Sequence, residues 1–155
     1  MEELAAGLWR WTARHPEWHP GEWGCEVAAF AVDAGDVTLL IDPLVEAPDQ
    51  LDSVVTESVA ILITIPYHTR SAESLRDRYS ASIHGHPAVT KRLRDRAGFE
   101  PIEPGAELPG GARAFAIGKP RRFEMPRSLM NDSAAAAPLT SKRFGPDTPA
   151  VRPMS

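Results

Sequence analysis

The apolar residues of this sequence gather in short runs, and the length of these runs limits what the chain can fold into. The longest wholly apolar runs include Val27 to Val32 and Val59 to Ile63. Such runs suit buried β-strands, whereas a membrane-spanning helix needs roughly 20 apolar residues. The sequence therefore predicts a domain built around a sheet, with no membrane partner.

Composition and charge narrow the class of protein further. The chain has 155 residues, of which 43% are hydrophobic and 25% are charged, a composition typical of one globular domain. The formal net charge of −4 offers no basic surface for a nucleic acid, so we expect no nucleic-acid partner. The first residues, Met1 to Glu3, are acidic where a signal peptide would be basic, and we expect a cytoplasmic protein.

The composition changes near Pro126. Residues 127–155 are rich in alanine and proline, and Phe144 is their sole aromatic residue. Such a segment has too little apolar surface to offset the entropy that ordering costs. We therefore expect a folded domain over residues 1–126 and a disordered tail over residues 127–155.

Strand and helix patterns alternate within residues 27–117. Two β-rich runs, 27–32 and 37–41, flank a turn that contains Asp and Gly, which predicts an antiparallel hairpin. Further along, the periodicity and capping residues predict helix 49–58, strand 60–65, a helix after Ser71, strand 81–84, helix 87–97 and strand 113–117. Together these elements predict an α/β chain with a mixed sheet.

All four tryptophans, Trp9, Trp11, Trp18 and Trp23, lie in the first 23 residues. Rings of this size need burial or a partner. We expect the N-terminal segment to wrap around its own sheet and bury them. The alternative is an exposed aromatic platform for a ligand or a second subunit.

The order of these motifs resembles the opening half of the metallo-β-lactamase fold. The resemblance covers roughly residues 24–120 and rests on five segments, which are Leu40-Ile41-Asp42-Pro43, Ile61-Leu62-Ile63-Thr64, Ile83-His84-Gly85-His86-Pro87, Pro104-Gly105-Ala106-Glu107-Leu108 and Phe115-Ala116-Ile117-Gly118. It implies an α/β (α+β) architecture, the N-terminal half of an αββα sandwich, whose mixed sheet carries helices on one face. A single half would leave the other sheet face and its edge bare, so we expect a homodimer or poor solubility.

The metal-binding loop of that family is where this chain departs from the resemblance. The family's loop reads His-x-His-x-Asp-His, and its ligands hold metal ions, commonly zinc, that activate water. If Thr64 begins this loop, the four ligand positions carry Ile65, Tyr67, Thr69 and Arg70. A later histidine position of the family carries Lys119. The resemblance therefore implies a metal-free, non-catalytic relative without a cofactor, in which Asp42 supports the loop by hydrogen bonding.

Positive charge persists where the family holds cations. His68, Arg70 and Lys119 are the candidate ligand-binding residues, and they suit a small anionic ligand such as a carboxylate or a phosphate. Two alternatives remain open. One is a hydrolase that acts through a residual zinc site at His68, His84 or His86, and the other is a truncated or frameshifted product without a function.

Overall fold

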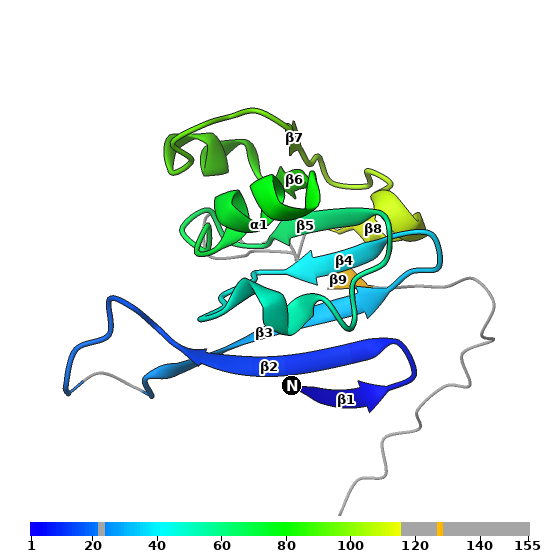
Figure 1. Ribbon diagram of the computed structural model, residues 1–155. Helices are drawn as coiled ribbons and strands as arrows, with labels where there is room; N and C mark the ends of the chain where they lie inside the picture. The colour runs from blue at the N-terminus through cyan, green and yellow to red at the C-terminus, as the bar shows by residue number, and fades with distance from the viewer. Residues whose placement is uncertain (22–23, 116–126, 129–155) are drawn as a thin grey trace, which may run out of the picture.

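The computed structural model of the chain describes residues 1–21, 24–115 and 127–128. A seven-stranded mixed sheet runs through it in the order β1-β2-β3-β4-β5-β6-β7 (Figure 1). Its strands are β1 (Glu2–Ala5), β2 (Leu8–Arg14), β3 (Glu26–Asp33), β4 (Thr38–Ile41), β5 (Val59–Ile63), β6 (Ser82–Gly85) and β7 (Phe99–Pro101). The strands β1 to β4 pair antiparallel, and β4 to β7 pair parallel. The predicted α/β class with a mixed sheet is confirmed.

The predicted hairpin forms between β3 and β4. The carboxylate of Asp33 accepts a hydrogen bond of 2.9 Å from the backbone N–H of Gly35. Gly35 has a φ of 92°, a left-handed conformation that glycine adopts without steric cost. The turn therefore follows directly from its Asp and Gly residues.

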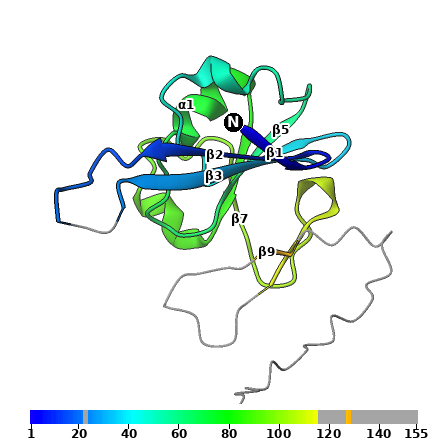
Figure 2. The ribbon, with the colours of Figure 1, turned by 90° about the horizontal axis from the view of Figure 1, so that it is seen from below.

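The α-helix and two of the described 3₁₀ helices gather on one face of the sheet. These elements are α1 (Ala72–Tyr79) and two 3₁₀ helices, η1 (Pro48–Leu51) and η2 (Pro87–Lys91). Their buried residues Leu51, Leu75 and Val89 belong to one core cluster with Leu40, Ile61, Ile63 and Ile83 of the sheet. Figure 2 shows α1 on one side of β2 and β3, and β9 on the other. Helices on one face of the sheet are as predicted.

The opposite face of the central strands is also buried. Its core cluster joins Leu39, Ile41, Ala60 and Leu62 of β4 and β5 to Ile102, Leu108, Ala112 and Ala114. The covering segment contains the 3₁₀ turn η3 (Pro109–Gly111) and β8 (Arg113–Ala114). The expectation that this face is bare is wrong over β4 and β5, because residues 102–114 fold back across it. The homodimer stays a prediction.

The N-terminal segment forms two strands that extend the sheet beyond β3. Trp11 is 6% exposed, and its indole Nε1 donates a hydrogen bond of 2.8 Å to the carbonyl oxygen of Leu44. Trp9 is partly buried against the same helix-side core. Trp18 lies after β2 with the Arg14 guanidinium 5.3 Å from its ring centroid, and Trp23 lies outside the described residues. The predicted burial is confirmed for Trp11 and is partial for Trp9.

The predicted helix 49–58 is wrong, because only its first residues are helical. The 3₁₀ helix η1 ends at Leu51, whose side chain is buried in the helix-side core. Beyond it, the backbone N–H of Thr56 donates to Thr38 Oγ1 at 2.9 Å. This bond to β4 holds residue 56 in a turn, so side-chain hydrogen bonding competes with the helix that the periodicity predicts.

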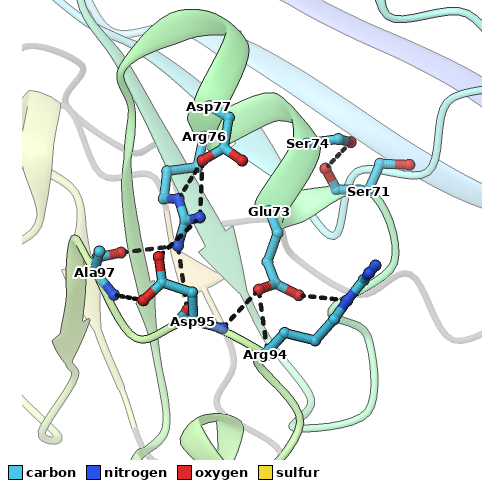
Figure 3. Close-up of polar contacts among 8 residues, drawn as sticks. All are labelled: Ser71, Glu73, Ser74, Arg76, Asp77, Arg94, Asp95 and Ala97. Carbon is cyan, nitrogen blue, oxygen red and sulfur yellow. Dashed lines mark hydrogen bonds and ion pairs between the residues drawn. The ribbon is translucent and has the colours of Figure 1, made fainter.

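The predicted helix 87–97 is also wrong beyond Lys91, where η2 ends. The Glu73 carboxylate on α1 accepts hydrogen bonds from the backbone N–H groups of Arg94, at 3.0 Å, and Asp95, at 2.9 Å (Figure 3). Arg76 Nη1 donates to the carbonyl oxygens of Asp95 and Ala97, both at 3.1 Å. Side chains of α1 thus satisfy the backbone of residues 94–97, which a helix would otherwise satisfy internally.

The last predicted elements fall mostly outside the described residues. Of strand 113–117, the structure gives β8, whose residues Arg113 and Ala114 pair antiparallel with β9 (Arg127–Ser128). The strand β9 comprises the first two residues of the predicted tail, and residues 129–155 lie outside the described part. Among the described residues, no helix is long and apolar enough to cross a bilayer.

Replacing Glu73 with alanine should lower the free energy of unfolding by about 1–3 kcal/mol, because two backbone N–H groups lose a charged acceptor. The Glu73 side chain is 20% exposed, so water replaces the lost bonds incompletely. Urea denaturation of Glu73→Ala against Glu57→Ala, an exposed glutamate in the loop before β5, checks this. Equal stability of the two variants would contradict the prediction.

Candidate functional site

The candidate site is the loop of residues 64–71, named here the strand-edge loop, which leaves the carboxyl end of β5 and leads into α1. Ligands of open α/β sheets bind at this edge of parallel strands. The loop is tied to the segment after β4, because the backbone N–H of Ser71 donates to the Pro43 carbonyl at 3.1 Å. Ser71 Oγ in turn accepts from the backbone N–H of Val45 at 3.0 Å. Both segments are therefore fixed relative to each other.

Asp42 joins the ends of β4 and β5. Its Oδ1 accepts a hydrogen bond of 2.7 Å from the backbone N–H of Thr64, and its Oδ2 bonds the Thr64 hydroxyl. The backbone of Asp42 has a φ of 45°, a left-handed conformation that non-glycine residues adopt at a cost. The carboxylate thus lies where the resemblance places a loop-supporting aspartate.

Arg70 lies against Asp42 through the backbone rather than through a carboxylate bond. Its Nη1 donates to the carbonyl oxygen of Asp42 at 2.8 Å and reaches that of Ala28 at 3.5 Å. Its Nε is buried and has no hydrogen-bond partner in the described part of the chain. Burial lowers the pKa of Arg70 from its usual value, and the nearby charge of Asp42 offsets this only in part.

His68 lies beside the carboxylate of Asp42. Its Nδ1 is 3.3 Å from Asp42 Oδ2, but this buried nitrogen meets no hydrogen-bond geometry with any described residue. The ring packs edge-on against Tyr67, with 5.3 Å between the centroids, and Tyr67 is 60% exposed. The structure thus brings His68 and Arg70 together around Asp42. Lys119, the third predicted ligand-binding residue, lies outside the described residues.

The other two histidines proposed for a residual zinc site point elsewhere. His84 is a buried residue within β6, and its partners are Ser82 and Glu100. His86 precedes η2, and its Nδ1 accepts a hydrogen bond of 3.1 Å from the backbone N–H of Ala88. Within residues 1–21, 24–115 and 127–128, no three His, Cys, Asp or Glu side chains gather closely enough to hold a metal ion.

An open hollow of about 380 Å³ lies beside α1. Figure 3 shows the residues that line it, which are Glu73, Ser74, Arg76, Asp77, Arg94 and Asp95. Their charges are largely engaged with one another, as in the ion pair between Arg76 and Asp77 at 2.8 Å. These contacts attach residues 94–97 to α1, so we assign the hollow a structural role.

One group of polar side chains on β6 and β7 was not predicted from the sequence. Ser82 Oγ and His84 Nε2 are 2.8 Å apart, and His84 Nδ1 lies 3.6 Å from Glu100 Oε2. The spacing of Ser82 and His84, two residues apart in a strand, was the available signal because it places both side chains on one face. Glu100 could not be found this way, since the strand pairing brings it to His84.

No protein-family model matches the sequence, and no curated protein matches it. Among solved structures, the chain is similar to a B3 metallo-β-lactamase with an active-site glutamic acid, at a TM-score of 0.51 and 16% identity. The similarity covers 63% of this chain and 48% of that enzyme, so the chain spans about half of its length. The likeness shows a metallo-β-lactamase-like fold, which is the architecture that the sequence motifs implied.

Replacing Asp42 with alanine should cost about 1–3 kcal/mol of folding free energy, because the Thr64 backbone N–H and hydroxyl lose their acceptor. Asparagine should cost clearly less, since it keeps one oxygen for the Thr64 N–H and tolerates a left-handed backbone. Chemical denaturation of Asp42→Ala and Asp42→Asn measures the difference. An equal loss of folding free energy in both variants would contradict the prediction, because the oxygen and the backbone conformation that asparagine keeps would then add no stability.

Proposed function

We propose that this chain is a binding domain of metallo-β-lactamase-like fold that holds an anionic group at the strand-edge loop rather than acting as a metal-dependent hydrolase. The observation that carries this proposal is the guanidinium of Arg70. It lies at the carboxyl edge of the parallel strands, on the loop where the resembling family has its metal ligands, and its Nε has no acceptor among the described residues.

The donor atoms at the loop do not fit the family's metal. Of the described residues that meet there, Asp42 and His68 carry atoms that bind zinc, whereas structural and catalytic zinc sites use three or four protein ligands. Arg70 also places a positive charge near Asp42, and this charge repels a divalent cation. A residual zinc site therefore has too few donors and an unfavourable charge in this part of the chain.

The same features favour an anion. The backbone carbonyls of Asp42 and Ala28 hold the Arg70 guanidinium in place, and desolvation lowers the pKa of Arg70 more than Asp42 raises it. The desolvated charge is thus incompletely balanced within the protein. A bound carboxylate or phosphate would balance it through charge-assisted hydrogen bonds, with His68 as a second contact.

Calorimetric titration with inorganic phosphate and with acetate tests the proposal. We expect saturable binding of at least one of them, and Arg70→Ala should weaken it about tenfold or more, because a hydrogen bond to a charged group contributes about 1.5–3 kcal/mol. His68→Ala should weaken it less. Arg92→Ala, which removes an exposed arginine after η2, should leave it unchanged, and thermal unfolding confirms that each variant is folded.

Two results would overturn the proposal. Equal, weak and salt-screened heats in the wild type and in Arg70→Ala would mean that no anion site exists at the loop. Stoichiometric zinc in the protein purified without chelators, with hydrolytic activity that a chelator removes, would instead support the hydrolase alternative.

A further inference from the structure

A row of three polar side chains crosses β6 and β7 on the face opposite α1. Ser82 and His84 alternate with buried Ile83 along β6, and the parallel pairing sets His84 beside Glu100 of β7. Ser82 Oγ lies 2.8 Å from His84 Nε2, and His84 Nδ1 lies 3.6 Å from Glu100 Oε2. A hydroxyl bonded to an imidazole that a carboxylate orients is the geometric signature of an activated nucleophile.

The surroundings of His84 favour the protonation state that this role requires. A carboxylate beside Nδ1 favours the tautomer with the proton on Nδ1, which leaves Nε2 to accept the Ser82 hydroxyl proton. Burial lowers the pKa of His84 below its usual value, and Glu100 offsets this only in part. Burial therefore favours the neutral imidazole, which is the form that acts as a base.

The row is also open to an incoming molecule. Ser82 is half-buried, and the side chain of Glu100 is 65% exposed. The strand β7 is the last strand at its edge of the sheet, as Figure 1 shows. His84 itself is shielded, with a side chain only 7% exposed, so its hydrogen bond with Ser82 is protected from competition with water.

We propose that Ser82 is an activated nucleophile that accepts an acyl group from a carboxylic ester, with His84 as its base. In this step a bond forms between Ser82 Oγ and the acyl carbon, and the bond between that carbon and the ester oxygen breaks. The serine proton passes to His84 Nε2 and then to the departing alkoxide. The site is separate from the strand-edge loop, which follows the carboxyl end of β5, and it needs no metal.

Glu100 is a positioning residue in this arrangement, because it acts through His84 and not on the ester. Its Oε2 lies within ion-pair distance of Nδ1, where it holds the tautomer and stabilises the imidazolium that forms during proton transfer. Aspartate at this position keeps the negative charge on a shorter side chain, whereas glutamine keeps the size and loses the charge. The two variants therefore separate a charge effect from a packing effect.

Labelling of the full chain with a fluorophosphonate tests the proposal, because this reagent phosphonylates activated serines with loss of fluoride. Intact-mass and peptide analysis should find one label, on Ser82. Ser82→Ala should abolish it, and His84→Asn should slow it about tenfold or more, as loss of a general base does. Ser53→Ala, at an exposed serine of the loop after η1, should label like the wild type.

Variants of Glu100 supply a second test that does not disturb the core. Glu100→Gln should slow labelling severalfold, and Glu100→Asp should restore part of the rate. The proposal is overturned if the wild type takes no label, if the label lies on another residue, or if folded His84→Asn and Glu100→Gln both label at the wild-type rate. Anion binding at the strand-edge loop is unaffected by any of these outcomes.

Discussion

The hydrogen bonds between the Asp42 carboxylate and Thr64 are the interaction on which the carboxyl edge of β4 and β5 depends. The carboxylate bonds both the backbone N–H and the hydroxyl of Thr64, so it joins the segment after β4 to the start of the strand-edge loop. The carbonyl of the same residue accepts from Arg70, near the other end of the loop. A partly buried carboxylate without such donors would be costly, and the loop is therefore held in the conformation that satisfies Asp42. The positions of His68 and Arg70 follow from this constraint.

Burial on both faces explains why the central strands are so apolar. The strand β5 is buried at every residue from Val59 to Ile63, as strands covered on both sides are. Helices cover one face, and residues 102–114 cover the other. Residues 102–114 contain the 3₁₀ turn η3 and the short strand β8, and they pack against β4 and β5. The row of Ser82, His84 and Glu100 lies on the neighbouring strands of that face, where Glu100 remains exposed.

The proposed anion site uses charge at the strand-edge loop differently from the metal site of the resembling family. A metal site gathers neutral imidazoles and carboxylates around a cation, whereas here the cation is the Arg70 side chain, which backbone carbonyls hold. The two proposals for this molecule rest on different physics. Anion binding follows from a desolvated positive charge at the carboxyl edge, and acyl transfer to Ser82 follows from a hydrogen-bonded base within a strand pair.

The sequence by itself determined the elements whose signals are local. The apolar runs fixed β3, β4 and β5, the Asp-Gly turn fixed the hairpin, and the pattern after Ser71 fixed α1. The order of the motifs also implied the fold, and it placed Asp42 after one strand and Arg70 in the loop that follows the next. Only the tertiary structure decided the rest, because the competing bonds join residues far apart in sequence. Glu73 satisfies the backbone of Arg94 and Asp95, Thr38 holds Thr56, and Glu100 reaches His84. A periodicity within one segment carries no information about such partners.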